Sequence, residues 1–118
     1  MELKFVHDTT AGGSLMGYIF NVTRAEIEKV FGAPTFDESV EPFSGDGKLT
    51  VSWCLRFADG TDAEIYDWKR YEMGTPGMNE RIDWNIGGSK FRAVELVAEL
   101  LGVTPRSSHD VLTRAGLA

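Results

Sequence analysis

The amino-acid sequence predicts an α+β fold, in which an antiparallel sheet of about five strands is covered on one face by helices. Runs with the alternating polar and apolar pattern of strands are interrupted by segments with the apolar spacing of helices. Asp59-Gly60, a hairpin signal, separates two of the strand-like runs and makes them antiparallel neighbours. The predicted order is ββαβββα, followed by a short extra C-terminal helix.

The length of 118 residues is typical of a single domain. We expect residues 1–102 to form this α+β domain and residues 103–118 to form a C-terminal extension with a short helix. Residues 2–6 and 15–20 predict the first two strands. We expect these strands to pair as a hairpin across a glycine-containing turn.

The first helix has a clear start and a clear end. Thr23 and Glu26 have the spacing of a capping box, and Val22 and Ile27 are placed to form a hydrophobic staple around it. Gly32 follows the last apolar residue of the helical pattern and ends the helix.

The middle of the chain predicts a loop and three strands. Residues 36–48 are rich in acidic and turn-forming residues and predict a surface loop. Residues 49–57 alternate with a period of two, and residues 63–68 return after the hairpin turn. Residues 81–86 place two isoleucines and a tryptophan on one face and predict the fifth strand.

Helical patterns dominate the C-terminal part. The glycine pair at residues 87–88 is predicted to form a turn, from which Ser89 caps a second helix that ends near Leu101. A second capping-box pattern at residues 107–110 opens a short terminal helix around residues 111–115.

Composition excludes several function classes. The formal net charge of -6 argues against direct nucleic-acid binding, which needs a basic surface. No apolar run is long enough to cross a membrane, and the first residues lack a signal-peptide pattern, so we expect a cytoplasmic protein. Cys54 is the single cysteine and predicts a small, half-buried thiol rather than a disulfide or a metal site.

The sequence does not favour an enzyme. His7 and His109 are interpreted as surface or capping residues, because no nucleophile motif accompanies them. Asp67 and Asp83 each precede a tryptophan and would act as a carboxylate pair if they were adjacent. The alternating pattern places Asp67 on the apolar face; a position past the buried part of the strand, or after a bulge, is favoured over a partly buried acid. We expect no cofactor, metal or catalytic residue, and a hydrolase built on His7 and the aspartates ranks last.

Two segments are candidate binding sites. The first is a helix N-terminus that resembles an anion cradle and consists of Gly87, Gly88, Ser89, Lys90 and Arg92. It lacks the spacing of a Walker loop, so a turn leading into an N-cap is the favoured interpretation. The second is a locally basic, aromatic cluster with the residue types that anchor protein interfaces: Tyr66, Trp68, Lys69, Arg70, Tyr71 and Arg81. This cluster is the favoured contact surface for a protein partner.

Five segments together carry a family resemblance: residues 13–19, 31–34, 57–61, 65–69 and 84–88. They follow the outline G-x-S-L-x-G-Y-I, F-G-x-P, F-x-D-G-T-x-A-x-I-Y-D-W-K and W-H-I-G-G, which resembles a group of small proteins encoded by tailed phages, especially phages of actinobacteria. Most of residues 12–102 are covered. Asn85 departs from the outline, because the group often has histidine there.

The resemblance implies a phage-encoded, non-enzymatic accessory protein in the host cytoplasm, which binds and modulates or inhibits a host protein such as a bacterial defence component. The alternative is a small-ligand or nucleotide-binding protein of the sponge type, with the glycine pair at the anion end and Trp68 or Trp84 stacking on a base. A homodimer is compatible with either function.

Overall fold

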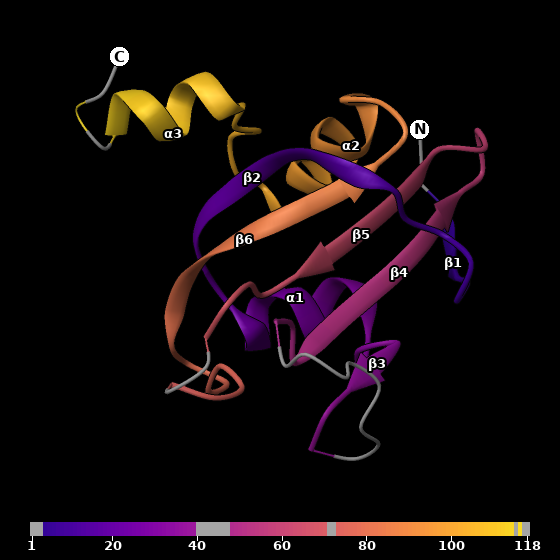
Figure 1. The fold of residues 1–118 in the computed structure, drawn as a ribbon. Coiled ribbons are helices and arrows are strands. Elements are labelled where there is room, and N and C mark those ends of the chain that lie inside the picture. The colour runs from indigo at the N-terminus through magenta and orange to yellow at the C-terminus, as the bar shows by residue number, and fades with distance from the viewer. Residues whose placement is uncertain (1–3, 40–47, 71–72, 115, 117–118) are drawn as a thin grey trace.

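Six antiparallel strands form one sheet, and two helices pack against one of its faces in the computed structural model, which describes residues 4–39, 48–70, 73–114 and 116 (Figure 1). The strands are β1 (Phe5–His7), β2 (Ser14–Thr23), β3 (Phe36–Asp37), β4 (Val51–Phe57), β5 (Asp62–Tyr66) and β6 (Arg81–Gly88). The helices are α1 (Arg24–Phe31), α2 (Arg92–Leu101) and α3 (Ser108–Arg114). The predicted fold class is confirmed.

The strands lie in the order β1-β4-β5-β6-β2, with β3 also paired to β4. The hairpin between β4 and β5, and the antiparallel pairing of β5 with β6, agree with the sequence pattern. β3 was not predicted, because it consists of two residues inside the segment interpreted as a loop. The rest of that predicted loop, residues 40–47, lies outside the described residues.

The predicted hairpin between the first two strands is wrong. β1 pairs with β4, whereas β2 pairs with β6 at the opposite edge of the sheet. Backbone hydrogen bonds explain the difference, because Asp8 N–H donates to the Cys54 carbonyl oxygen at 3.0 Å and Ala11 N–H donates to the Asp8 carbonyl oxygen at 2.9 Å. These contacts direct the chain across the sheet face opposite α1 and α2, which we call the open face (Figure 1).

The core lies between the sheet and the two helices α1 and α2. Trp53 and Trp84 are fully buried there, with ring centroids 5.5 Å apart at an interplanar angle of 78°. Each indole N–H finds a backbone acceptor at 2.9 Å, Trp53 on the Gly32 carbonyl oxygen and Trp84 on the Val22 carbonyl oxygen. Two large aromatic residues are thus buried without an unsatisfied donor.

The capping box that starts α1 is confirmed. Thr23 Oγ1 accepts from the Glu26 N–H at 3.1 Å, and the Thr23 N–H donates to Glu26 Oε1 at 2.9 Å. Val22 and Ile27, the predicted staple, are both buried. Local sequence therefore specifies this helix start.

The predicted start of α2 is wrong. Gly87 and Gly88 are the last residues of β6 rather than a turn, and Ser89 does not cap the helix. α2 begins after Phe91, whose side chain makes no capping hydrogen bond. The strand continues through the glycines because Gly88 pairs with Ser14 on the neighbouring strand β2.

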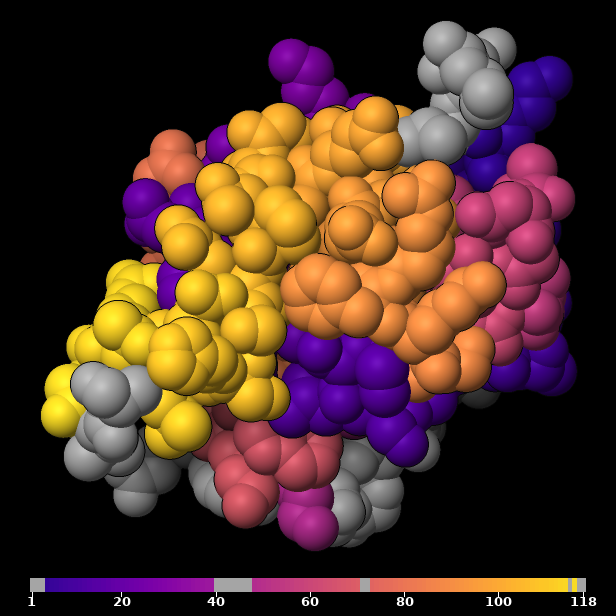
Figure 2. All heavy atoms as spheres, turned by 90° about the horizontal axis from the view of Figure 1, so that it is seen from above, coloured from indigo at the N-terminus to yellow at the C-terminus, as the bar shows by residue number. Residues whose placement is uncertain are grey.

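The segment after α2 returns to the edge of β2. Arg106 and Tyr18 exchange backbone hydrogen bonds of 2.9 and 3.0 Å, and Gly17 leaves room for this contact, since a Cβ there would lie 2.3 Å from the Arg106 carbonyl oxygen. The second capping box is confirmed, with Ser107 N–H donating to Asp110 Oδ2 at 2.7 Å and Asp110 N–H donating to Ser107 Oγ at 3.4 Å. Figure 2 shows this C-terminal segment in yellow, beside α2 in orange and β2 in indigo. No described helix is long and apolar enough to span a membrane.

Candidate functional site

The predicted partner-binding cluster is divided by the structure. Trp68 is 43% exposed and Lys69 is exposed, whereas Arg70 is only 8% exposed and Tyr66 only 9%. Arg81 is exposed at the start of β6, where its guanidinium lies 3.0 Å from Glu26 Oε1. Tyr71 lies outside the described residues.

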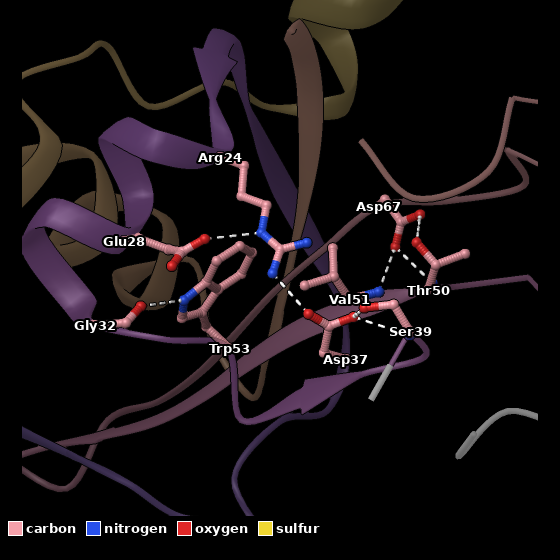
Figure 3. A network of polar contacts seen from close by, with 9 residues as sticks. All are labelled: Arg24, Glu28, Gly32, Asp37, Ser39, Thr50, Val51, Trp53 and Asp67. Atoms are coloured by element: carbon pink, nitrogen blue, oxygen red, sulfur yellow. Dashed lines mark hydrogen bonds and ion pairs between the residues drawn. The ribbon is translucent and has the colours of Figure 1, made fainter. Parts of the chain in front are cut away.

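Asp67 holds the start of the loop between β5 and β6 against β4 (Figure 3). One carboxylate oxygen accepts from the backbone N–H of Thr50 at 2.7 Å and of Val51 at 3.0 Å, and the other accepts from the Thr50 hydroxyl at 2.7 Å. The side chain lies beyond the end of β5 and yet is only 1% exposed. The strand ends before Asp67, in line with the interpretation favoured from the sequence, but the expected loss of burial is wrong, because Asp67 is a buried acid with three donors.

Arg70 braces the interior of the same loop. Its Nε donates to the Gly74 carbonyl oxygen at 3.0 Å, and its Nη2 lies 2.7 Å from Glu80 Oε2. Lys69 has a positive φ of 53°, and its N–H donates to the Lys48 carbonyl oxygen at 2.6 Å. Arg70 is thus a structural residue of the loop and not an exposed contact, contrary to the sequence-based prediction.

Among the described residues of the braced loop, three large apolar side chains are exposed. Trp68, Met73 and Met78 have exposed fractions of 43%, 69% and 46%. The Trp68 indole contacts the Tyr66 ring edge to face at 5.9 Å, and Lys69 Nζ lies 5.8 Å from the indole centroid. We call Trp68, Met73 and Met78 the loop patch.

Tyr66 supports Trp68 from the open face. Its hydroxyl is hydrogen-bonded by the side chain of Asn85, its cross-strand neighbour on β6, and burial raises the pKa of Tyr66. Asn85, singled out from the sequence because it departs from a histidine position, therefore packs beside Tyr66 on the sheet. The contact orders the ring on which the indole packs.

The predicted anion site is not assembled. Gly87 and Gly88 are buried in the sheet, and Ser89, Lys90 and Arg92 are exposed. The first-turn amides of α2 are already engaged, because Ala93 N–H donates to the Lys90 carbonyl oxygen at 3.1 Å and Val94 N–H to the Phe91 carbonyl oxygen at 2.9 Å. The amides of Ala93 and Val94 are therefore not free to bind a phosphate.

A hollow of about 560 Å³ on the open face lies above Cys54 and Glu64, under the chain that links β1 to β2. Ser52 Oγ donates to Glu64 Oε2 at 2.7 Å and lies 3.4 Å from Cys54 Sγ. Burial raises the pKa of Cys54 to about 11, so the thiol is protonated at neutral pH. The arrangement is a hydrogen-bonded cluster without an activated nucleophile.

Ser52 and Glu64 were missed from the sequence. The signal for them was the β4–β5 hairpin, because its register places Cys54 opposite Glu64 and Ser52 opposite Tyr66. Side chains that alternate along paired strands lie side by side on one face.

The remaining catalytic candidates are engaged elsewhere. His7 contacts the Thr35 hydroxyl at 2.6 Å and the Phe31 carbonyl oxygen at 2.7 Å, and His109 is exposed on α3. Asp83 accepts from the Asn21 N–H at 2.9 Å and pairs with Arg114 at 3.1 Å. Asp67 and Asp83 bond different elements, so the structure does not assemble the carboxylate pair. Among the described residues, no group of three or more metal-ligating side chains comes together.

Comparison of the chain with protein families, curated proteins and solved structures finds no match. The features that bear on function are therefore physical ones: a tryptophan held out in solvent by a braced loop, and the hollows of the open face.

Proposed function

We propose that this chain is a non-enzymatic accessory protein that binds another protein through the loop patch, with Trp68 as the central contact. The observation that carries the proposal is the contrast within one short segment. Trp68 is 43% exposed, while Asp67 and Arg70 on either side are 1% and 8% exposed. The buried polar contacts of Asp67 and Arg70 thus hold the apolar Trp68 ring in a solvent-exposed position.

Such an arrangement suits binding for two reasons. Tryptophan is the residue type most enriched among contacts that dominate binding free energy, and methionine adapts its shape to a partner. A loop that is already ordered loses little conformational entropy on association. The hydrogen bonds of Asp67 and Arg70 hold residues 67–70, and Trp68 among them, in place before the partner arrives.

The partner expected for this patch is a protein with an apolar pocket and, overall, a basic surface. The chain has a net charge of -6, so a partner with a basic surface is electrostatically favoured overall. At the patch itself, Glu80 is paired with Arg70 and Lys69 Nζ lies 5.8 Å from the Trp68 indole centroid. The resemblance to phage-encoded proteins makes a host protein in the bacterial cytoplasm, such as a defence component, the partner that we propose.

The test is capture of the partner from host cells with the tagged chain, followed by calorimetry with both purified proteins. We expect Trp68→Ala to weaken the partner's Kd at least about tenfold, because an anchoring ring is removed. Leu112→Ala is the matched control, since Leu112 is 45% exposed on α3 and lies outside the loop patch.

Equal affinity of the wild type and Trp68→Ala would place the interface elsewhere and overturn the proposal. An equal loss in the Leu112→Ala protein would do the same, because it would make α3 part of the contact. Circular dichroism of both variants checks that each retains the native fold.

A further inference from the structure

A second feature of the open face lies at the opposite side of the sheet from β1, around Phe20 of β2. Two arginines of the C-terminal segment flank this ring, with the guanidinium carbon of Arg114 at 4.5 Å and that of Arg106 at 5.4 Å from its centroid. Hollows of about 290 and 420 Å³ border it, one next to Asn85 and the other next to Arg106. This region therefore brings together the aromatic ring of Phe20, the side-chain amide of Asn85 and the guanidinium groups of Arg106 and Arg114.

The aromatic surface is built from neighbouring rings on β2. Tyr18 and Phe20 have ring centroids 6.4 Å apart at an interplanar angle of 35°, and both line the smaller hollow. Asn85 lies directly opposite Tyr18 in the β2–β6 register and lines the same hollow. Aromatic faces combined with an amide are the groups that stack on a nucleobase and hydrogen-bond its edge.

The two arginines of this region, Arg114 at the smaller hollow and Arg106 at the larger one, differ in their ion pairs. Arg114 is neutralised by Asp83, which lies 3.1 Å away in the smaller hollow. No ion pair engages Arg106 among the residues that the structure describes. Asp110 shares the larger hollow, and its carboxylate, which accepts from the Ser107 N–H and hydroxyl at 2.7 and 3.1 Å, stays negative and attracts Arg106, so a bound phosphate competes with Asp110 for this guanidinium.

We propose that this region binds a nucleoside monophosphate, with the base on Tyr18 beside Phe20, its edge at Asn85 and the phosphate at Arg106. Arg114 already forms an ion pair with Asp83 at 3.1 Å, whereas Arg106 forms no ion pair among the described residues, so the phosphate is assigned to Arg106. A guanidinium offers paired donors to phosphate oxygens. The backbone bridge between Arg106 and Tyr18 holds the two ends of the site together.

This site is independent of the loop patch and differs from the anion site predicted at the glycine pair. The sequence did not indicate it, because Arg106 is distant in sequence from Phe20 and reaches β2 only through the fold. Its occupant is a free nucleotide rather than a nucleic acid, since the surrounding chain is acidic.

The experiment is titration calorimetry of the full chain with AMP and with UMP, together with adenosine and inorganic phosphate alone. We expect at least one nucleotide to bind, adenosine to bind more weakly, and phosphate alone not to bind measurably. Arg106→Gln should weaken nucleotide binding at least about tenfold, because it removes the cation but keeps the backbone bridge. Phe20→Leu should also weaken it, because the ring over which the Arg106 and Arg114 guanidinium groups lie is replaced by a branched chain.

The matched control is Arg92→Gln, which removes the same charge at the start of α2, and it should bind as the wild type does. Failure of both nucleotides to bind the wild type, or unchanged affinity in Arg106→Gln, would overturn the proposal. An equal loss in Arg92→Gln would overturn it too, because it would place the anion end at the glycine pair. Trp68→Ala should retain nucleotide binding, which keeps this test separate from that of the loop patch.

Discussion

Asp67 is the residue on which the loop between β5 and β6 depends most directly. Its carboxylate receives three hydrogen bonds, and all three donors belong to Thr50 and Val51 at the start of β4. A buried acceptor with three matched donors stabilises the fold, but removal of the acceptor leaves the donors without partners. One side chain therefore joins the strand end, the loop and the adjacent strand.

Asp67→Asn is expected to lower the free energy of unfolding by about 2–3 kcal/mol, because the amide nitrogen would face a donor. Urea denaturation of the variant and the wild type measures the difference. Asp83→Asn is the control, since Asp83 has a side chain that is 43% exposed, and it should cost less than about 1 kcal/mol. Equal losses in the two variants would contradict the role assigned to Asp67.

The Cys54 thiol is expected to be almost unreactive in the folded protein. It is 3% exposed, and burial raises its pKa to about 11, so both access and the thiolate fraction are low. A thiol-specific disulfide reagent at pH 8 should label the native chain far more slowly than the chain in urea. Because this is the single cysteine, the readout is unambiguous. Equal rates in the two states would show that the hollow above Cys54 exposes the sulfur.

At the scale of the elements, β6 packs closely against its neighbours at Gly88. Gly88 lies where β6, β5 and α2 meet, and a Cβ there would be 2.7 Å from the Asp62 carbonyl oxygen and 2.8 Å from the Ala93 Cβ. Neither neighbour is the flexible end of a side chain. The glycine pair therefore serves close packing of the sheet against α2, rather than ligand binding.

Gly88→Ala is expected to destabilise the protein by about 2–4 kcal/mol, because backbone must move to admit the methyl group. Thermal or urea denaturation measures this loss. Gly77→Ala is the matched control, since the nearest atom to its added Cβ is 3.9 Å away. A Gly88→Ala protein as stable as the wild type would show that β6 and α2 adjust freely.

Across the whole molecule, carboxylates that accept hydrogen bonds dominate the ionisation behaviour. The Thr10 hydroxyl, with smaller contributions from the Thr10 N–H and Arg56, lowers the pKa of Asp8 to about 2. The Thr23 N–H lowers the pKa of Glu26. Hydrogen bonds and neighbouring cations likewise lower the pKa of further carboxyl groups, namely Asp37, Asp59, Glu80 and Asp110. The folded state therefore holds protons less tightly than the unfolded chain in the acid range.

Stability is expected to fall as the pH falls below about 4.5, with the loss continuing to about pH 2. The sign follows from the direction of the shifts. A carboxyl whose pKa is lowered by folding contributes stability above its unfolded pKa and loses it as the pH falls through its folded pKa. Urea midpoints measured from neutral pH to about pH 2.5 test this. A constant midpoint over that range would contradict it.

Local patterns in the sequence were sufficient for the fold class, both capping boxes and the β4–β5 hairpin. Each of these depends on residues within a few positions of one another, such as Thr23 with Glu26 or Asp59 with Gly60. Because the interacting groups are neighbours along the chain, the pattern itself contains the interaction.

Contacts between distant segments decided the rest. One example is the pairing of β1 with β4, and another is the position of Arg106 beside Phe20, because both join residues that are far apart in the sequence. The buried contacts of Asp67 and Arg70 belong here too, because nothing in the sequence distinguishes these two residues from surface residues. The choice of strand partner, and the burial of a polar side chain, depend on which surfaces of the chain pack together. The alternating pattern of one strand does not specify which strand lies beside it. For the same reason, the sequence could single out Trp68 and the glycine pair as unusual, but it could not say what each does. Only the tertiary structure shows that Trp68 is exposed and that the glycine pair is closely packed.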